Sequence, residues 1–196
     1  LARVNVVALD KTGTITFGGP EVTDVVVVAG GDELSMLRRA AAVERKSQHP
    51  LARAVVRFAA SKNIDVVDAE GFSSLTGAGA SGRVDGTTVV VAKPAHYMRT
   101  LGVDLGPLAS RVEELEGEGK TVVVVGDGVA AHGLLALRDQ VRPNAKKAIS
   151  ELRRLGVKVV MLTGDNERAG RAVAREVGID DIHAGLTPAE KSERVK

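Results

Sequence analysis

The stretch VNVVALDKTGTIT, residues 4–16, decides the fold. Val4 to Leu9 form a short, almost unbroken apolar run, which is typical of a parallel strand covered on both faces. Asp10 follows directly, where such a strand ends, and open α/β sheets bind ligands outside the carboxyl ends of their strands. Gly13 lets the chain turn away sharply behind it. The stretch therefore predicts a carboxylate that is presented to a substrate.

Bulk composition excludes several classes of protein. The chain has 196 residues, enough for one or two domains, and is 44% hydrophobic but only 2% aromatic, so its core must consist mainly of Val, Ala and Leu. A formal net charge of +2 is too small to indicate nucleic-acid binding. The absence of cysteine excludes disulfides and thiolate metal sites within this sequence. No apolar run reaches the ~18 residues that a membrane-spanning helix needs.

A second stretch repeats the design at Asp10. Residues 157–162 form another apolar run, and they lead through Thr163, Gly164 and Asp165 into a helix that we expect to end near Gly178. The order is again an apolar strand, a polar loop at its carboxyl end, and a helix. An Asp or Asn that caps the helix would explain the loop equally well.

The rest of the chain predicts elements of both types. Asp32 is placed to cap one helix, Pro50 suits the first turn of a second, and Pro143 opens a third with an apolar stripe at positions 145, 148, 149, 152 and 155. A charged helix is expected over residues 105–118. Strands are expected over residues 22–28 and 121–125, with a hairpin near 83–92, a turn at 126–128, and residues 134–137 returning to the first sheet.

Residues 10–16, DKTGTIT, resemble the phosphorylation motif of the P-type ATPases, with Ile where Leu is commoner. The resemblance implies that Asp10 attacks the γ-phosphate of ATP and becomes an aspartyl phosphate. An Asp that only caps a turn is the alternative. Soluble phosphatases of the wider haloacid dehalogenase superfamily usually carry a second Asp two residues later, as general acid and base. Here that position is Thr12, so the phosphoenzyme should hydrolyse slowly.

Two later motifs resemble the same family. Thr163, Gly164 and Asp165 match its T-G-D motif, whose hydroxyl and amide would hold phosphate oxygens at a helix N-terminus. Residues 186–191, LTPAEK, match L-x-P-x-x-K, which implies that Lys191 contacts the phosphoryl group. A lone lysine on a helix is otherwise a solvated residue. The implied catalytic set is Asp10, Lys11, Thr12, Thr163, Gly164, Asp165 and Lys191, with Asp10 and Thr12 as Mg²⁺ ligands and the remaining ligands expected beyond Lys196.

The middle of the chain carries the nucleotide signals. Residues 49–50, His-Pro, resemble the S-E-H-P-L signature of the heavy-metal, CPx-type branch, although Gln48 replaces the usual Glu. The resemblance implies that Glu44 and His49 contact adenine and that Gly77 and Gly79 approach the ribose and phosphates. Alternatively, His49 caps a helix or lies on the surface. Residues 77–82 could equally form a flexible turn, and they formally match the G-x-G-x-x-G fingerprint of dinucleotide-binding domains.

The predicted fold class is therefore α/β. A haloacid dehalogenase-like parallel-sheet domain, discontinuous over residues 1–19 and 134–196, is interrupted by an inserted α+β nucleotide-binding domain over residues 20–133. Asp139 and Arg142 match the family's D-x-x-R at the hinge between the domains. A structural ion pair between these two residues is an equally good account of them.

The resemblance implies the ATP-binding and phosphorylation region of a heavy-metal-transporting P-type ATPase, with ATP and Mg²⁺ as cofactors. We expect a monomeric, soluble piece that faces the cytoplasm in a longer membrane protein, meets the metal only there, binds no nucleic acid and phosphorylates poorly alone. Three alternatives remain open. They are a soluble haloacid dehalogenase-type phosphatase, a dinucleotide-binding oxidoreductase domain, and a nucleotide-binding module without catalysis.

Overall fold

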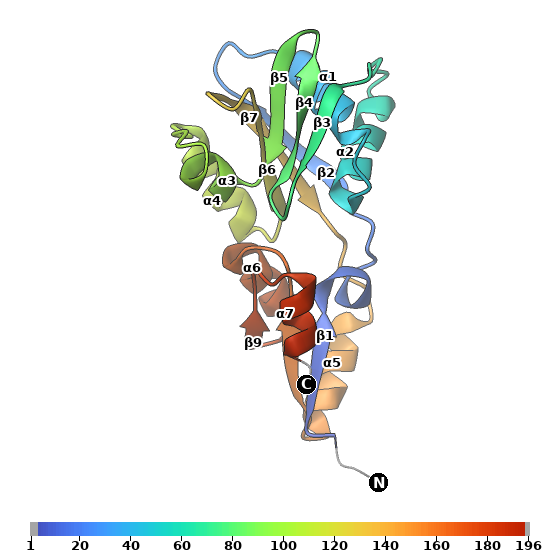
Figure 1. Cartoon of the computed structure of the whole chain (residues 1–196). Helices are drawn as coiled ribbons and strands as arrows, with labels where there is room; N and C mark the ends of the chain where they lie inside the picture. The colour runs from blue at the N-terminus through green and yellow to red at the C-terminus, as the bar shows by residue number, and fades with distance from the viewer. Residues whose placement is uncertain (1–3, 195–196) are drawn as a thin grey trace. The chain divides into compact units, whose positions relative to one another are not determined.

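The structure is a computed structural model that describes residues 4–194; the predicted domain ranges also include residues 1–3 and 195–196, which lie outside the described residues. The chain forms two compact units (Figure 1). Unit 1 contains the residues up to Gly19, Glu116–Thr121 and the residues from Asp139 onward, and unit 2 contains Pro20–Leu115 and Val122–Arg138. Within residues 4–194, no helix combines the length and the apolar character that crossing a membrane requires.

Unit 1 is built on a parallel sheet. Strand β1 pairs with β8, and β8 pairs with β9, in both cases in parallel, so the strand order is β1-β8-β9. The elements are β1 (Val6–Asp10), the turn η1 (Lys11–Ile15), α5 (Ala145–Arg154), β8 (Lys158–Leu162), α6 (Glu167–Val177), β9 (Asp181–His183) and α7 (Pro188–Glu193). The predicted parallel α/β domain is therefore confirmed.

The core of unit 1 lies between β8 and the helices. Ile149 of α5 packs with Val159 and Met161 of β8 and with Val173 and Val177 of α6. Both helices are amphipathic, so each presents one apolar stripe to the sheet. Gly178 ends α6 in the left-handed conformation, with φ of +82°, which a residue without a Cβ adopts at no steric cost.

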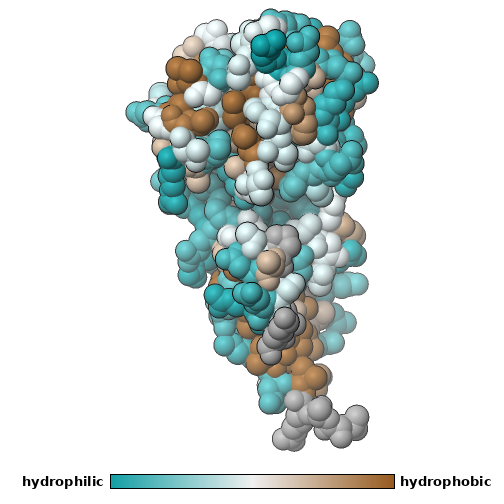
Figure 2. Space-filling model, in the orientation of Figure 1, coloured by the Kyte–Doolittle hydropathy of each residue, from teal (hydrophilic) through white to brown (hydrophobic). Residues whose placement is uncertain are grey.

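Two burial predictions for unit 1 are wrong. Val6 is 53% exposed and the other residues of β1 are only half-buried, so the strand is not covered on both faces. Two members of the apolar stripe expected in α5 are exposed. Ala148 lies on the exposed side of the helix, and Leu155 is 74% exposed because the helix ends at Arg154 and the chain turns at Gly156. Figure 2 shows apolar atoms exposed on unit 1 toward the end where β1 begins.

Unit 2 contains a six-stranded sheet with the order β2-β7-β6-β5-β4-β3. Its elements are β2 (Glu21–Val27), α1 (Glu33–Glu44), α2 (Pro50–Ser61), β3 (Glu70–Leu75), β4 (Gly79–Val84), β5 (Thr87–Ala92), α3 (Pro94–Arg99), α4 (Leu108–Gly117), β6 (Thr121–Gly126) and β7 (Ala131–Arg138). The paired strands whose register is described run antiparallel. The predicted α+β character of this region is confirmed.

Helices cover both faces of the unit 2 sheet (Figure 1). Side chains of a strand alternate between faces, so β5 places Val89 and Val91 in one core and Val90 and Ala92 in the other. The first core includes α1 and α2, and the second includes α3 and α4. The strands between the two cores must therefore be apolar on both faces, which explains the continuous valine runs of β5 and β6.

One topology prediction is wrong. Residues 134–137 do not return to the first sheet, because they lie in β7, which pairs antiparallel with β2 inside unit 2. The chain consequently re-enters unit 1 at Asp139 and not at residue 134. Several local predictions are confirmed: Asp32 caps α1, Pro50 begins α2, and the Asp127 carboxylate accepts hydrogen bonds from the Val129 and Ala130 amides in the β6–β7 turn.

Candidate functional site

Unit 1 brings Asp10 and Lys191 together from opposite ends of the chain. The Nζ atom of Lys191 lies 2.6 Å from Oδ1 of Asp10, although 181 positions separate the two residues. Asp10 is the last residue of β1, and Lys191 projects from α7. The Asp10 side chain stays 41% exposed, so a carboxylate with an attached cation is open to solvent at the carboxyl edge of the sheet.

The polar loop after β8 lies beside this pair. Asp10 is in register with Leu162, so Thr163 follows on the neighbouring strand at the same edge. Thr163 is 1% exposed and its hydroxyl accepts a hydrogen bond from the Asp165 amide at 3.1 Å. The cap of α6 is Asn166, whose side chain accepts from the Ala169 amide at 2.9 Å. Helix capping therefore accounts for Asn166 and leaves Asp165 available for another role.

Asp165 is held by Lys11. The Lys11 ammonium lies 2.8 Å from Oδ2 of Asp165, and both side chains are largely buried. The carboxyl edge of the sheet therefore has two Lys–Asp pairs. Each pair joins a residue at the junction of β1 and η1 to a later segment of the chain. Thr12, another predicted catalytic residue, is exposed on the turn that follows Asp10. Gly164 is half-buried, and a Cβ on it would lie 3.2 Å from the Leu186 carbonyl oxygen.

The turn that follows Asp10 is closed by Thr16. The Thr16 amide donates to the Lys11 carbonyl at 3.0 Å, and the Thr16 hydroxyl lies 2.5 Å from an Asp139 carboxylate oxygen and 3.0 Å from the same carbonyl, either of which can accept its single proton. Gly13, with φ of +80°, makes the reversal possible. Thr16 was not among the predicted site residues, although its place in the quoted motif could have indicated it.

The two predicted hinge residues both contact this turn. Asp139 accepts from the Gly18 and Gly19 amides, and Arg142 donates to the carbonyls of Thr16 and Gly13 at 3.0 and 3.1 Å. In the part of the chain that the structure describes, they form no ion pair with each other, so the ion-pair alternative is wrong. Both residues tie the segment that re-enters unit 1 to the turn behind Asp10.

In unit 2, Glu44 and His49 flank the connection between α1 and α2. Glu44 is 8% exposed, and burial raises the pKa of its carboxyl to about 7. The His49 side chain caps α2, since its Nδ1 accepts a hydrogen bond from the Leu51 amide at 3.2 Å. The structure therefore gives His49 the capping role that the sequence left open.

The two predicted nucleotide glycines lie where β3 turns into β4. Gly77 has φ of +71°, which favours glycine. Gly79 pairs with Ala92, and a Cβ on it would lie 2.1 Å from the Val91 carbonyl oxygen, so β5 leaves no room for a side chain. Because strand β4 follows these glycines where a dinucleotide-binding fingerprint requires a helix, the oxidoreductase interpretation is wrong.

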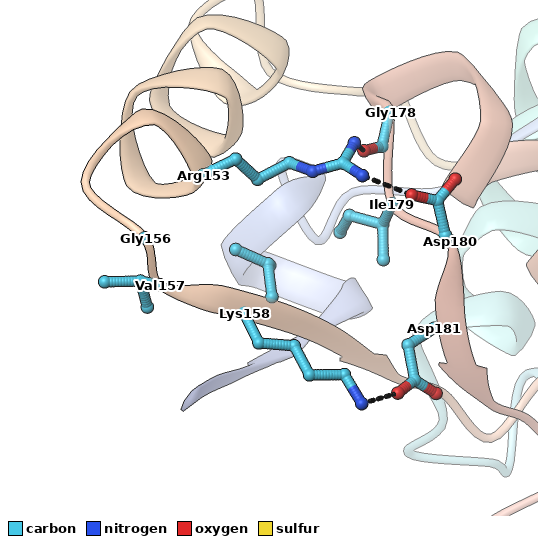
Figure 3. Close-up of a pocket in the computed structure, with 9 residues that line it drawn as sticks. Arg153, Gly156, Val157, Lys158, Gly178, Ile179, Asp180 and Asp181 are labelled. Atoms are coloured by element: carbon cyan, nitrogen blue, oxygen red, sulfur yellow. Dashed lines mark hydrogen bonds and ion pairs between the residues drawn. The ribbon is translucent and has the colours of Figure 1, made fainter. Parts of the chain in front are cut away.

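A pocket in unit 1 lies away from Asp10, at the opposite end of β8. Figure 3 shows that its polar side chains point to one another: Arg153 pairs with Asp180, and Lys158 pairs with Asp181 at 2.6 Å. Arg153 also donates to the Gly178 carbonyl at the end of α6. These groups join α5, β8, α6 and β9, and their charges compensate one another. The Asp10 edge is therefore the better candidate for a functional site in unit 1.

Comparison with known proteins decides the family. The family model described as a haloacid dehalogenase-like hydrolase matches residues 4–196. The chain belongs to the haloacid dehalogenase-like hydrolase family. The predicted fold of this family, with a parallel-sheet domain and a second α+β region, is confirmed.

Individual relatives indicate a narrower group of proteins than the family model does. The chain is 43% identical over 184 residues to a copper-transporting P-type ATPase of Rhizobium leguminosarum bv. viciae, covering 93% of this chain and 22% of that protein. A zinc-transporting PIB-type ATPase crystallised in an E2.Pi state is 41% identical, with a TM-score of 0.68, covering 98% of this chain and 31% of that one. The catalytic CPx-ATPase domain CopB-B is 25% identical with a TM-score of 0.69, covering 98% and 65% respectively.

These matches confirm the resemblance to heavy-metal P-type ATPases along nearly the whole chain. The chain spans about a quarter of the length of the curated relatives that it matches.

Proposed function

We propose that the chain is the ATP-binding and phosphorylation region of a longer, ATP-driven heavy-metal transporter. Asp10 attacks the γ-phosphate of ATP, the bond from that phosphorus to the ADP oxygen breaks, and an aspartyl phosphate remains on the chain. The observation that carries the proposal is the 2.6 Å contact between Lys191 and Asp10 at the carboxyl edge of a parallel sheet. A cation at that position would neutralise the charge that develops on the transferred phosphoryl group.

The neighbouring groups have consistent roles. The Thr163 hydroxyl and Gly164 amide follow β8 at the same edge, where they would hold phosphate oxygens, and Lys11 and Asp165 hold each other in place. Thr12 supports slow hydrolysis, because it offers a hydroxyl where a soluble phosphatase would need a carboxylate as general base. A long-lived phosphoenzyme suits a transporter, so Thr12 argues against the phosphatase alternative.

The site fits Mg²⁺ as a partner of phosphate. Within residues 4–194, no group of three or more His, Cys, Asp or Glu side chains could hold a metal alone. Mg²⁺ is usually bound by one or two carboxylates together with substrate phosphates and water, and the exposed Asp10 carboxylate and an oxygen of Thr12 supply such a partial set. When bound, Mg²⁺ would neutralise charge on the phosphate oxygens.

Unit 2 would bind the nucleotide. Glu44 and His49 lie at the α1–α2 connection, where an acid and an imidazole could meet the adenine base, and Gly77 and Gly79 would let the backbone approach the ribose and phosphates. Asp139 and Arg142 lie where the chain passes back from unit 2 to unit 1 and would act as the hinge. The relatives include proteins named as copper and zinc transporters, so the cargo is a heavy-metal cation whose identity we leave open.

The test is labelling of the full-length protein with ATP that carries ³²P on the γ-phosphate, followed by an acid quench. We expect a label that resists acid and is released by hydroxylamine, as an acyl phosphate is. Asp10→Asn should abolish it because the amide cannot act as the nucleophile. Asp180→Asn is the matched control, since Asp180 is an exposed unit 1 carboxylate paired with Arg153. Label that survives in Asp10→Asn would place the nucleophile elsewhere.

A further inference from the structure

Lys191 must hold its ammonium against Asp10 from a helix of only six residues, α7. Isolated helices that short do not persist in water, because nucleating the first turn is unfavourable and few bonds follow. The side chain of a lysine also has high conformational entropy. Something besides helix propensity must therefore fix the start of α7.

A capping box fixes that start. The Glu190 carboxylate accepts hydrogen bonds from both the amide and the hydroxyl of Thr187, each at 2.7 Å, and the Thr187 hydroxyl accepts from the Glu190 amide at 3.4 Å. These bonds satisfy donors that the first turn of a helix otherwise leaves unpaired. The Thr187 amide and hydroxyl hold the pKa of Glu190 below its usual value, because both donate to the charged carboxylate.

The cap is tied to the phosphate-binding candidate loop. The Leu186 amide donates to the Thr163 carbonyl at 3.0 Å, and the Gly185 amide donates to the Asp165 carbonyl. One turn after the cap, the Lys191 amide donates to the Thr187 carbonyl at 3.0 Å. Backbone hydrogen bonds, with the peptide bond between Leu186 and Thr187, therefore connect the Thr163 loop to Lys191.

We propose that Thr187 and Glu190 are positioning residues that place the Lys191 ammonium against Asp10. This inference rests on the proposed phosphorylation of Asp10. The two residues touch neither the phosphate nor Asp10, and they act only through Lys191. Losing them frees the first turn of α7, and the ammonium then samples positions from which it cannot neutralise the phosphoryl group.

The experiment uses the full-length protein and first verifies that labelling depends on Asp10, so that a failure of the proposed function is recognised separately. Thr187→Val removes the hydroxyl at nearly constant volume, and Thr187→Ser restores it. We expect Thr187→Val to slow phosphoenzyme formation at saturating ATP about 5- to 10-fold, the usual size of a lost N-cap, and Thr187→Ser to recover most of the rate. The Kd for a non-hydrolysable ATP analogue should not change.

The decisive comparison repeats Thr187→Val in a Lys191→Met background. If Thr187 acts through Lys191, the second substitution has nothing left to disturb and the rate of the double variant equals that of Lys191→Met. An equal slowing in both backgrounds would overturn the inference, as would an unchanged rate in Thr187→Val. Glu190→Gln should behave like Thr187→Ser, because Gln also completes a capping box, and Glu190→Ala should behave like Thr187→Val.

Discussion

The predicted residues of unit 1 and of unit 2 differ in how the fold explains them. In unit 1, Asp10 and Lys191 meet at 2.6 Å across 181 positions, and Lys11 meets Asp165 at 2.8 Å. In unit 2, His49 caps a helix and Gly79 lies against a neighbouring strand that leaves no room for a side chain. The Lys191–Asp10 contact lacks an evident structural task, whereas His49 and Gly79 each have one.

This difference between the two units shows which contacts are evidence for a function and which are explained by folding. Exposed ion pairs contribute little to stability, and ordering two long side chains costs entropy, so the Lys191–Asp10 contact is poorly explained by folding alone. A helix cap or a turn glycine is expected in any domain. The case for phosphoryl chemistry in unit 1 is therefore stronger than the case for nucleotide contacts in unit 2, and each prediction below challenges one side of that contrast.

Among the predictions that challenge this contrast, the largest effect is expected for Lys191→Met in the full-length protein. The substitution keeps the length of the side chain and removes the charge beside Asp10, so the rate of phosphoenzyme formation should fall about 10²- to 10³-fold, as when one oxyanion-stabilising group is removed. The Kd for a non-hydrolysable ATP analogue should stay unchanged, because the candidate nucleotide contacts lie in unit 2. Rapid-quench labelling measures the rate, and isothermal titration measures the Kd.

Lys147→Met is the matched control, since Lys147 is an exposed lysine of α5 in the same unit. It should label at the normal rate. A Lys191→Met protein that labels as fast as the control would show that the contact with Asp10 is an ordinary surface ion pair, and the contrast between the two units would disappear.

The next effect concerns the buried acid of unit 2. Burial raises the pKa of Glu44 from 4.5 to about 7, so the folded state holds a proton that the unfolded state has lost between those pH values. The contribution of Glu44 to stability should therefore be largest below pH 4.5 and decline as the pH rises through 7, a loss of about 3 kcal/mol from this group. Urea unfolding of the chain across this pH range measures the decline.

Glu44→Gln stays neutral at every pH and should remove this decline, while Glu33→Gln, at the exposed start of the same helix, should leave it in place. If Glu44 instead serves to meet a nucleotide, the ATP analogue should bind with a pH dependence near 7 that Glu44→Gln abolishes. A Glu44 that lowers stability on acidification would contradict the assignment of a burial-raised pKa.

The sequence predicted the parts of the fold that depend on local pattern. The predicted apolar runs at residues 4–9 and 157–162 correspond to the strands Val6–Asp10 and Lys158–Leu162. The shared edge of a parallel sheet brings Asp10 and Thr163 together, as the rule for such sheets requires. The cap formed by Asp32, which accepts from the amides of residues 34 and 35, could be predicted from the helix-capping preference of Asp alone. The Lys191 contact was predicted solely from the family motif, since nothing local distinguishes that lysine.

The failures concern features that only tertiary structure determines. Residues 134–137 are apolar on both faces, and that pattern fits either sheet, so the pairing of β7 with β2 could not be read from it. The exposure of Val6 depends on what packs over the face of β1, which the periodicity of the strand does not encode. The capping box at Thr187 follows the local pattern T-x-x-E, but residues 186–191 were interpreted only as a motif that supplies Lys191.

The smallest effect separates the two roles of His49. His49→Ala removes both the helix cap and the imidazole, whereas His49→Asn keeps a cap, because Asn is among the best N-cap residues and can still accept from the Leu51 amide. If the imidazole meets adenine, both variants should weaken binding of a non-hydrolysable ATP analogue about 5- to 10-fold, which is the size of one lost hydrogen bond. Only His49→Ala should also lower stability, by about 1 kcal/mol.

Titration calorimetry and urea unfolding of the three proteins distinguish the outcomes. Normal affinity in His49→Asn together with weak affinity in His49→Ala would mean that the cap, and not the ring, is what binding needs. Normal affinity in both would remove His49 from the nucleotide site. Either result would mean that the fold of unit 2 fully explains His49. The nucleotide would then have to be recognised by groups other than the His-Pro signature, because a helix cap that Asn can replace does not distinguish adenine.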